Sequence, residues 1–301
     1  MRYGIFLSGG GYSGAGQGKS VGTIVQRLGL KPVVIRAVSV GAFTGASLVE
    51  HDFDDRPVND IWVNKVQVCG PNLVFPRTFG ALWRFITLRS YIFSDEGLYH
   101  LTNLLDINKV CDPNSCRLEV RVFNLLSKKP ETHSNHDEDV QRDPELFRAY
   151  IRASARLPGI FESEEINGAP YCDAIMGSTI PLFSRHKCDL VFAVVNDPLD
   201  YDVSRFISWW VRLRGIPHIV TDTSLEEDRE SFGDGLVTIR PDKRIGKLSR
   251  MSFMQGRACE VRVVRGKRVV KEKRLVYLGD IATEIEEAGL RTNRVLDSLS
   301  L

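Results

Sequence analysis

Cysteine is scarce in this chain, and its six cysteines form no pattern that would hold a metal. There is no CxxC pair and no His/Cys cluster at zinc spacing. A secreted disulfide scaffold or a zinc module would need such a pattern. We therefore expect reduced thiols in the core, although Cys111 and Cys116 could in principle form a bridge.

Long hydrophobic runs are also missing. The longest apolar stretches, such as LVFAVV at 190–195, are far shorter than the roughly 20 residues that span a bilayer. The first residues, MRYGIFLSGGG, lack the length and the small-residue cleavage site of a secretory signal peptide. These absences predict a cytoplasmic protein that is at most peripheral to a membrane.

No strong charge of either sign marks the chain as a whole, because its formal net charge is +2. Hydrophobic residues make up 43% and charged residues 26%, which is ordinary for a soluble globular protein. The 301 residues are enough to bury a substantial core. Since no internal repeat or low-complexity linker divides the sequence, we predict a single domain over residues 1–301.

Strand-like and helical segments alternate from the start of the chain. Residues 3–7 and 32–38 form apolar runs typical of buried strands, and helical spacing follows at 20–28 and 41–50. This order predicts an α/β fold with a mostly parallel sheet. Further predictions are strands at 118–126, 171–173 and 190–196, helices at 94–105, 144–155 and 281–299, a hairpin at 261–276, a surface loop at 133–143, and a lid over a pocket at the aromatic, proline-broken stretch 71–88.

The glycine-rich stretch SGGGYSGAGQGKS, at 8–20, allows more than one interpretation. Its end, Gly18-Lys19-Ser20, fits the end of the phosphate-loop pattern GxxxxGK[ST], but the first glycine of that pattern would be residue 13, a serine. A phosphate loop also needs an acid that holds magnesium, for which Asp173 and Asp197 are candidates. A nucleotide-binding enzyme is therefore one alternative, and a glycine turn that only packs a strand against a helix is another.

A serine stands at the second strand-to-helix junction, in AVSVGAF at 37–43. Ser39 matches the nucleophile elbow GxSxG, with Ala37 in place of the first glycine and Gly41 as the second. At the start of the next helix, the helix dipole and free N–H groups favour developing negative charge. A serine that only caps the helix is the alternative at this position.

The two glycine-containing loops make chemical sense together. An acyl-transfer serine needs N–H donors aimed at the tetrahedral oxyanion. In a parallel sheet the first strand-to-helix loop lies next to the second, so Gly9, Gly10 and Gly11 would lie beside Ser39. Glycine there permits backbone conformations that turn N–H groups inward.

Serine at neutral pH also needs a general base. None of the six histidines stands at an obvious strand end; His133 and His136 read as surface residues, while His186 or His218 could complete a Ser-Asp-His triad. Asp173 is the better candidate because it ends a short strand, and a carboxylate in a dry pocket can accept the serine proton directly. A turn-capping aspartate is the alternative.

Four segments in this order resemble the patatin-like phospholipases. GGGYSG at 9–14 is similar to the oxyanion loop of that family, and AVSVGA at 37–42 to its elbow. RASARLPGIF at 152–161 resembles its ASxxxPxxF segment through Ala153, Ser154, Pro158 and Phe161. CDAIMGSTIPL at 172–182 resembles its DG[GA] segment, with a proline eight residues after the aspartate. The likeness spans roughly residues 3–200.

The resemblance implies a three-layer α/β/α sandwich that hydrolyses acyl esters, with a phospholipid as the natural substrate and no metal or other cofactor. It implies a catalytic dyad of Ser39 and Asp173, an oxyanion hole at Gly9, Gly10 and Gly11, and support of the elbow by Gly41. The sequence departs from the family at Ser13 (often Arg or Lys), Ala37 and Ala174 (both usually glycine). Lys19 could supply the charge missing at residue 13. A lipid-binding protein that has lost catalysis is a further alternative.

The last third of the chain is basic. Residues 240–274 contain thirteen Lys/Arg against three Asp/Glu, and residues 203–214 combine two tryptophans with arginines. Such segments suit contact with an anionic membrane surface, and the alternative is a core helix followed by an ordinary basic hairpin. No nucleic-acid-binding motif accompanies the charge, so no nucleic-acid partner is expected. The oligomeric state is left open.

Overall fold

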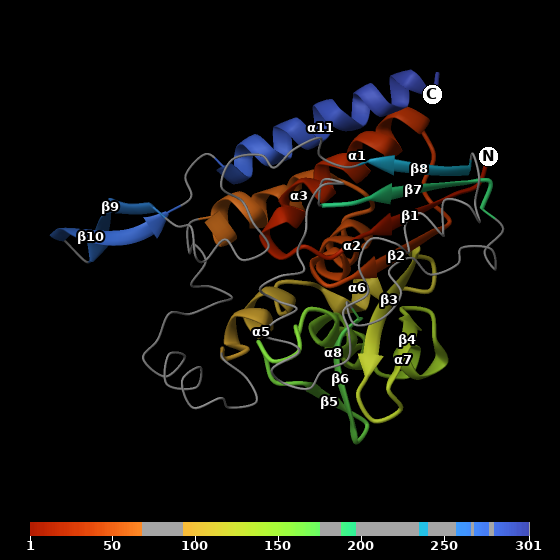
Figure 1. Ribbon diagram of the computed structural model, residues 1–301, viewed down its shortest axis with the longest axis horizontal. Coiled ribbons are helices and arrows are strands. Elements are labelled where there is room, and N and C mark those ends of the chain that lie inside the picture. The colour runs from red at the N-terminus through yellow and green to blue at the C-terminus, as the bar shows by residue number, and fades with distance from the viewer. Residues whose placement is uncertain are drawn as a thin grey trace.

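A computed structural model of the chain describes residues 1–67, 93–174, 188–196, 235–239, 257–265, 268–276 and 280–300. Its centre is an eight-stranded mixed sheet with the order β5-β6-β3-β2-β1-β7-β8, in which β4 pairs only with β3 (Figure 1). The strands from β3 to β8 along this order are mutually parallel, and β4, β5 and β6 add antiparallel pairings. The strands are β1 (Tyr3–Leu7), β2 (Val34–Val38), β3 (Arg117–Asn124), β4 (Lys129–Ser134), β5 (Glu164–Ile166), β6 (Ala169–Asp173), β7 (Leu190–Val194) and β8 (Leu236–Ile239).

Helices cover the sheet, and α1 and α11 lie side by side along one flank of it (Figure 1). A separate antiparallel ribbon, formed by β9 (Arg257–Arg265) and β10 (Arg268–Val276), lies away from the sheet. The helices are α1 (Gln17–Leu28), α2 (Val40–Glu50), α3 (Asp55–Asp60), α5 (Glu96–Thr102), α6 (Ile107–Val110), α7 (Glu138–Arg142), α8 (Pro144–Ser154) and α11 (Asp280–Ser298), with a 3-10 helix η1 (Gly11–Gly16) and a π-helix η2 (Ile61–Gln67).

Both faces of the sheet are buried, which makes it the middle layer of the molecule. Side chains alternate between the faces along each strand, so Ile35 and Ala37 join the larger core with the helices. Val34 and Val38, their neighbours on β2, join a second buried cluster on the opposite face together with Phe6. This double burial explains the near-continuous apolar runs of the parallel strands.

The sequence predicts most elements that form this sheet and its helices. All the predicted strands and helices are present within a few residues, and the hairpin is confirmed as β9 and β10. The predicted surface loop at 133–143 is wrong, because this stretch contains the end of β4 and the helix α7. The sequence patterns do not predict β4, β5 and β8, because β4 is polar and only partly buried, β5 has only three residues and β8 only four.

Several predictions lie outside the described residues. These are the predicted lid (71–88), the Trp/Arg segment 203–214, the basic stretch before β9 (240–256), His186, His218, Asp197, and the family segment after Ala174. Within the described residues, no helix combines the length and the apolar character needed to cross a bilayer.

Candidate active site

Ser39 lies at the junction of β2 and α2 with an unusual backbone. Its φ of 58° and ψ of −130° place a non-glycine residue in a strained region that surrounding structure must enforce. Its side chain makes no capping hydrogen bond to α2, which argues against the alternative of a serine that only caps the helix. The Ser39 hydroxyl therefore lies at the start of α2 and makes no hydrogen bond that caps this helix. The residue is 9% exposed.

Gly41 allows this elbow to lie against β1. A Cβ atom at residue 41 would come within 2.5 Å of the Leu7 carbonyl oxygen and 2.9 Å of the Leu7 Cβ. These contacts involve the fixed backbone of a central strand, so no larger residue fits without moving β1 or α2. The second glycine of the elbow pattern is thus required by close packing.

The glycine loop after β1 lies directly beside the elbow. A Cβ at Gly9 would be 3.1 Å from the Ser39 Cβ and 3.6 Å from the Ser39 Oγ. Gly10 and Gly11 have φ values of 147° and 55°, both in the region that favours glycine. The structure therefore brings the first loop and Ser39 together, as the order of the parallel strands predicts.

Asp173 reaches the same place through the pairing of β3. β4 occupies one edge of β3 over residues 119–124, so β2 and β6 must share its other edge. β2 ends at Val38, opposite Arg121, and β6 ends at Asp173, opposite Val122. Ser39 and Asp173 therefore leave the sheet at neighbouring positions of one strand. The Asp173 side chain is fully buried.

The C-terminal end of α8 holds the backbone of both residues. The Ser39 N–H donates to the Ser154 Oγ at 2.8 Å, and the Ser154 hydroxyl donates to the Arg121 carbonyl, also at 2.8 Å. The Asp173 N–H donates to the Arg156 carbonyl at 2.9 Å. This short segment thus fixes the relative position of the two backbones, and it supplies an acceptor for the N–H of the strained elbow.

Two comparisons of sequence now bear on these residues. The sequence model of the patatin-like phospholipases matches residues 5–184, which is more than half of the chain. The chain belongs to the patatin-like phospholipase family. Its matched region contains Ser39, Asp173 and the glycine loop. A search of curated protein sequences returned no match.

Solved structures with a similar fold complete the comparison. The crystal structure of VipD from Legionella pneumophila is similar over 99% of this chain and 67% of VipD, with a TM-score of 0.53 and 14% sequence identity. Human GIVD cytosolic phospholipase A2, solved with methyl gamma-linolenyl fluorophosphonate and terbium chloride, covers less: 75% of this chain and 45% of its own, with a TM-score of 0.33 and 12% identity. The predicted three-layer patatin-like α/β/α fold is confirmed, and family membership supports a lipid hydrolase activity.

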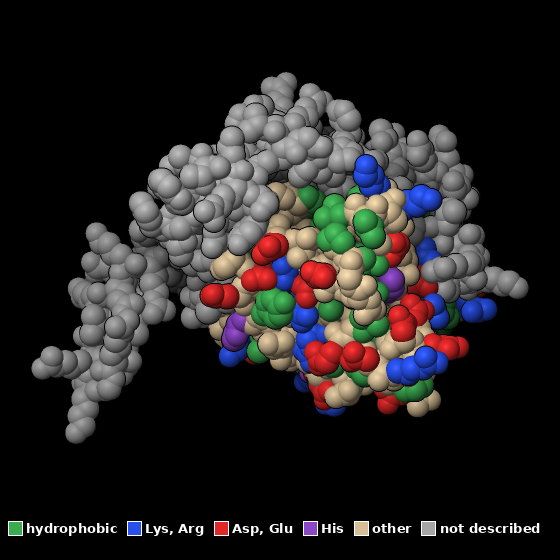
Figure 2. Space-filling model, turned by 90° about the horizontal axis from the view of Figure 1, so that it is seen from below, with side chains coloured by type: hydrophobic (Ala, Val, Ile, Leu, Met, Phe, Trp, Pro, Cys, Tyr) green, Lys and Arg blue, Asp and Glu red, His purple; other side chains and the backbone are tan. Residues whose placement is uncertain are grey.

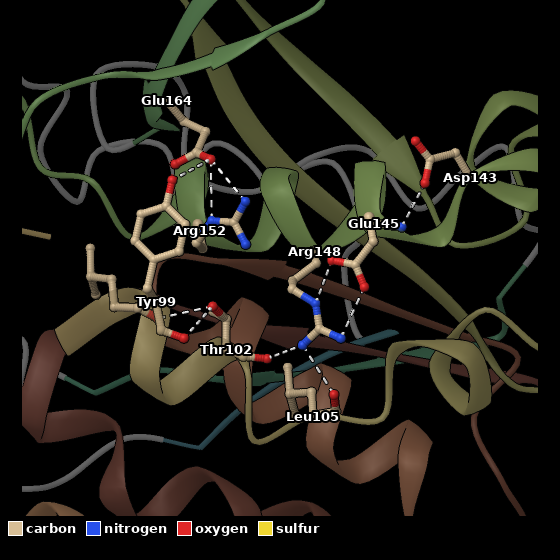
Figure 3. A network of polar contacts seen from close by, with 9 residues as sticks. Tyr99, Thr102, Leu105, Asp143, Glu145, Arg148, Arg152 and Glu164 are labelled. Atoms are coloured by element: carbon tan, nitrogen blue, oxygen red, sulfur yellow. Dashed lines mark hydrogen bonds and ion pairs between the residues drawn. The ribbon is translucent and has the colours of Figure 1, made fainter. Parts of the chain in front are cut away.

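Ion pairs and hydrogen bonds anchor α8 of this patatin-like protein, and Figure 3 shows those that Arg148 and Arg152 make. Arg152 pairs with Glu164 at 2.9 Å, and its guanidinium lies 4.4 Å from the ring centre of Tyr99 on α5. Arg156 is only 3% exposed and bonds both Glu164 and Asp95. Because a buried ion pair is costly to break, this network keeps the helix end that carries Ser154 in a fixed position.

Other residues that the sequence singles out have structural roles. Lys19 forms an ion pair with Asp55 of α3 at 3.4 Å, and its stem packs beside Gly289 of α11. Ala174 is buried in the second cluster, so its methyl group is accommodated after Asp173. Cys111 and Cys116 are free thiols, and no bridge joins them. Burial raises the pKa of the Cys172 thiol, next to Asp173, to about 12, so it is no competing nucleophile at neutral pH.

His133 and His136 lie in β4 and shortly after it. The His133 ring stacks on Tyr150 at 3.7 Å between ring centres and is partly buried in β4, so its prediction as a surface residue is wrong. Burial lowers the pKa of both His133 and His136. Among the described residues, no cluster of three or more His, Cys, Asp or Glu could hold a metal ion.

Sequence reasoning missed two polar side chains next to the glycine loop. Gln17 and Asn196 both donate to carbonyl groups of the loop. Asn196 directly follows the apolar run of β7, and a polar residue at the end of a central parallel strand is the signal that could have found it.

Proposed function

We propose that this protein is a lipid acyl hydrolase of the phospholipase A type, with Ser39 and Asp173 as its catalytic dyad. In this mechanism the Ser39 Oγ attacks the carbonyl carbon of a fatty-acyl ester while Asp173 accepts the serine proton. The oxyanion that forms is stabilised by N–H groups of Gly9, Gly10 and Gly11.

The reaction then proceeds through a covalent intermediate. The tetrahedral adduct collapses, the leaving alcohol takes the proton from Asp173, and the acyl group stays on Ser39 as an ester. Water gives a proton to the same aspartate and attacks this ester. When the second tetrahedral adduct collapses, Asp173 returns that proton to the Ser39 Oγ and the fatty acid leaves. Water is the only co-reactant of the ester in this reaction, so the proposed dyad needs no cofactor.

The elbow geometry carries this proposal. A serine in a strained backbone conformation, with a hydroxyl that does not cap its own helix and a glycine loop within van der Waals contact, is costly to build for packing alone. Family membership favours an acyl ester of a lipid as substrate. The same features argue against a protein that only binds lipid.

The phosphate-loop alternative is disfavoured by the contacts of its residues. Gly18 lies within α1, where a Cβ would be 2.4 Å from the Val58 Cγ1, and Lys19 is paired with Asp55. Both residues thus face neighbouring helices, and helix packing explains them.

Contact with an anionic membrane surface is the second part of the proposal, and the ribbon β9–β10 is its best candidate. Between Arg257 and Val276 the sequence has eight Lys/Arg against two Glu. The register pairs Arg265 with Arg268 and Arg262 with Lys271, while Glu260 pairs with Lys273. On the face seen in Figure 2, by contrast, acidic and basic side chains of the described residues are interspersed. A basic ribbon that lies away from the sheet suits attraction to anionic headgroups.

Release of free fatty acid from mixed phospholipid vesicles tests the activity. We expect turnover by the wild type, a loss of roughly 10⁴-fold or more in kcat for Ser39→Ala, and a loss of about 10²–10⁴-fold for Asp173→Asn. Ser134→Ala and Asp189→Asn are the matched controls, because Ser134 lies at the end of β4 and Asp189 at the opposite end of the sheet. Equal turnover in Ser39→Ala and the wild type would overturn the proposal.

A further inference from the structure

Asn196 lies where β7 meets the glycine loop. β7 is the direct parallel neighbour of β1, and the Ser8 N–H donates to the Val194 carbonyl at 3.1 Å. The Asn196 N–H in turn donates to the Ser8 Oγ at 3.0 Å. The end of β7 therefore runs alongside the first residues of the loop.

The Asn196 side chain bonds two successive carbonyl groups of that loop. Its Nδ2 donates to the Ser8 carbonyl at 3.2 Å and to the Gly9 carbonyl at 3.0 Å. A second amide, Gln17 Nε2 at the start of α1, donates to the Ser8 carbonyl at 2.8 Å. Gln17 is 1% exposed, so this bond is made away from water.

These bonds determine which way the loop amides point. In a planar trans peptide the C=O and the N–H of the next residue point in opposite directions. Since the carbonyls of Ser8 and Gly9 point at Asn196, the N–H groups of Gly9 and Gly10 must point away from it. Those are two of the three N–H groups that the proposed oxyanion hole requires.

Close packing reinforces this arrangement. A Cβ at Gly10 would come within 2.9 Å of the Asn196 Cβ and 3.0 Å of its Nδ2. The absence of a side chain at Gly10 is therefore what lets the asparagine approach the loop backbone. Asn196 and Gly10 form one unit, in which the amide sets the peptide orientation and the glycine makes room for it.

We propose that Asn196 is a positioning residue for the oxyanion loop. Its single amide group fixes both peptide planes whose N–H groups stabilise the oxyanion, while Gln17 supports the first of them. The inference rests on the proposed hydrolase function for its kinetic consequence, but its structural consequence, the orientation of two peptide planes, stands without it.

The variant Asn196→Asp tests the role with little change of shape. An ionised carboxylate only accepts hydrogen bonds, so it would face two carbonyl oxygens with no proton to offer. We expect the second-order rate constant for labelling of Ser39 by a fluorophosphonate to fall about 10–100-fold, less than the loss of a donor itself. The kcat for ester hydrolysis should fall in parallel with KM changed less than about twofold, because the oxyanion exists only in the transition state.

Asn135→Asp is the matched control. The Asn135 Nδ2 also donates to two backbone carbonyls, of Val110 and Cys116, at 2.7 and 3.0 Å, but at the end of β4. It should lose stability and keep the wild-type labelling rate. Asn196→Ala serves if the aspartate variant does not fold.

The crystal structure of Asn196→Asp gives the second readout, which needs no activity. Rotation of the Ser8–Gly9 or Gly9–Gly10 peptide plane, with an unchanged loop in Asn135→Asp, supports the inference. Unchanged peptide planes overturn it. Wild-type labelling rates in Asn196→Asp also overturn it, whereas absence of labelling in the wild type speaks only against the proposed hydrolase function.

Discussion

The two halves of the glycine-rich stretch between Ser8 and Ser20 serve different parts of the molecule. In the front half, Gly9 lies against Ser39 and Gly10 against Asn196, both at the carboxyl ends of parallel strands. In the back half, Gly18 and Lys19 lie in α1 and contact Val58 and Asp55 of α3. The front half faces the candidate catalytic residues, and the back half packs helices together.

The difference shows why a glycine pattern by itself is ambiguous. Each glycine permits either an unusual φ or a close approach, and a close approach can involve either a substrate-binding region or a neighbouring helix. Gly10 has a positive φ and lies against the Asn196 side chain, whereas Gly18 lies in a regular helix. Substitutions in the two halves should therefore separate activity from stability.

Among substitutions in the glycine-rich stretch, Gly10→Ala should have the largest effect on activity. Alanine at a φ of 147° is strained, and its Cβ would press on Asn196 at 2.9 Å. We expect kcat/KM for ester hydrolysis to fall on the order of 10²-fold, comparable with the loss of an oxyanion donor. The strain should also lower the free energy of unfolding by about 1–3 kcal/mol. Kinetics and urea unfolding measure the two effects, and an unchanged kcat/KM would contradict the assignment of the front half.

Ser154→Ala and Ser134→Ala allow the same comparison of activity with stability at the residue that binds the Ser39 backbone. Both serines are almost fully buried and accept a backbone N–H, from Ser39 at 2.8 Å and from His136 at 3.1 Å. Each variant should lose about 1–3 kcal/mol of stability through an unsatisfied buried donor. Only Ser154→Ala should also slow kcat, by roughly 10-fold, since only it loosens the elbow whose position the reaction depends on. Equal kcat values in the two variants would limit Ser154 to a structural role.

Gly18→Ala should affect stability without affecting the rate. A Cβ 2.4 Å from the Val58 Cγ1 forces α1 and α3 apart, which should cost about 1–3 kcal/mol of unfolding free energy. The kcat/KM of the folded protein should stay within about twofold of the wild type. The double variant Gly18→Ala/Val58→Ala should recover part of the loss, because the two sites are in contact. A tenfold fall in kcat/KM would connect the back half with the chemistry.

Lys19→Ala should have the smallest effect. Its ion pair with Asp55 is partly exposed, with 41% of the lysine side chain accessible, so its loss should cost at most about 1 kcal/mol. Hydrolysis of anionic and zwitterionic phospholipids should be unchanged. A loss of activity on only one of these two lipid classes would support the hypothesis that Lys19 supplies the positive charge missing at residue 13.

The sequence predicts the fold well because the signals of this fold are local. Strand-like runs such as residues 3–7 and 32–38, each followed by helical spacing, directly encode the parallel sheet. The short or polar strands β4, β5 and β8 escape prediction, since their hydrogen bonds to neighbouring strands, and no pattern of their own, define them. The same reason explains α7, which lies in a polar stretch that resembles a loop.

The candidate site likewise has parts that the sequence predicts and parts that it does not. Ser39, Asp173 and the glycines stand in motifs, so residue type and spacing in the sequence are enough to single them out. The contacts that support them are not encoded in this way. Ser154 stands in the ASxxxPxxF segment, but nothing local indicates its bond to Ser39, 115 residues away, and Asn196 lies 187 residues from Gly9. Such contacts depend on how β2, β3 and β7 assemble, and a single sequence contains no local record of them.

Covalent labelling of Ser39 is the most direct test of the central claim, that this serine is an activated nucleophile. The wild-type protein would be treated with a lipid-like fluorophosphonate, and the modified residue would be located by peptide mass spectrometry. The account predicts one adduct on Ser39, absent in Ser39→Ala and much slower to form in Asp173→Asn. A fully folded wild-type protein that remains unlabelled, or an adduct on another serine that persists in Ser39→Ala, would contradict it.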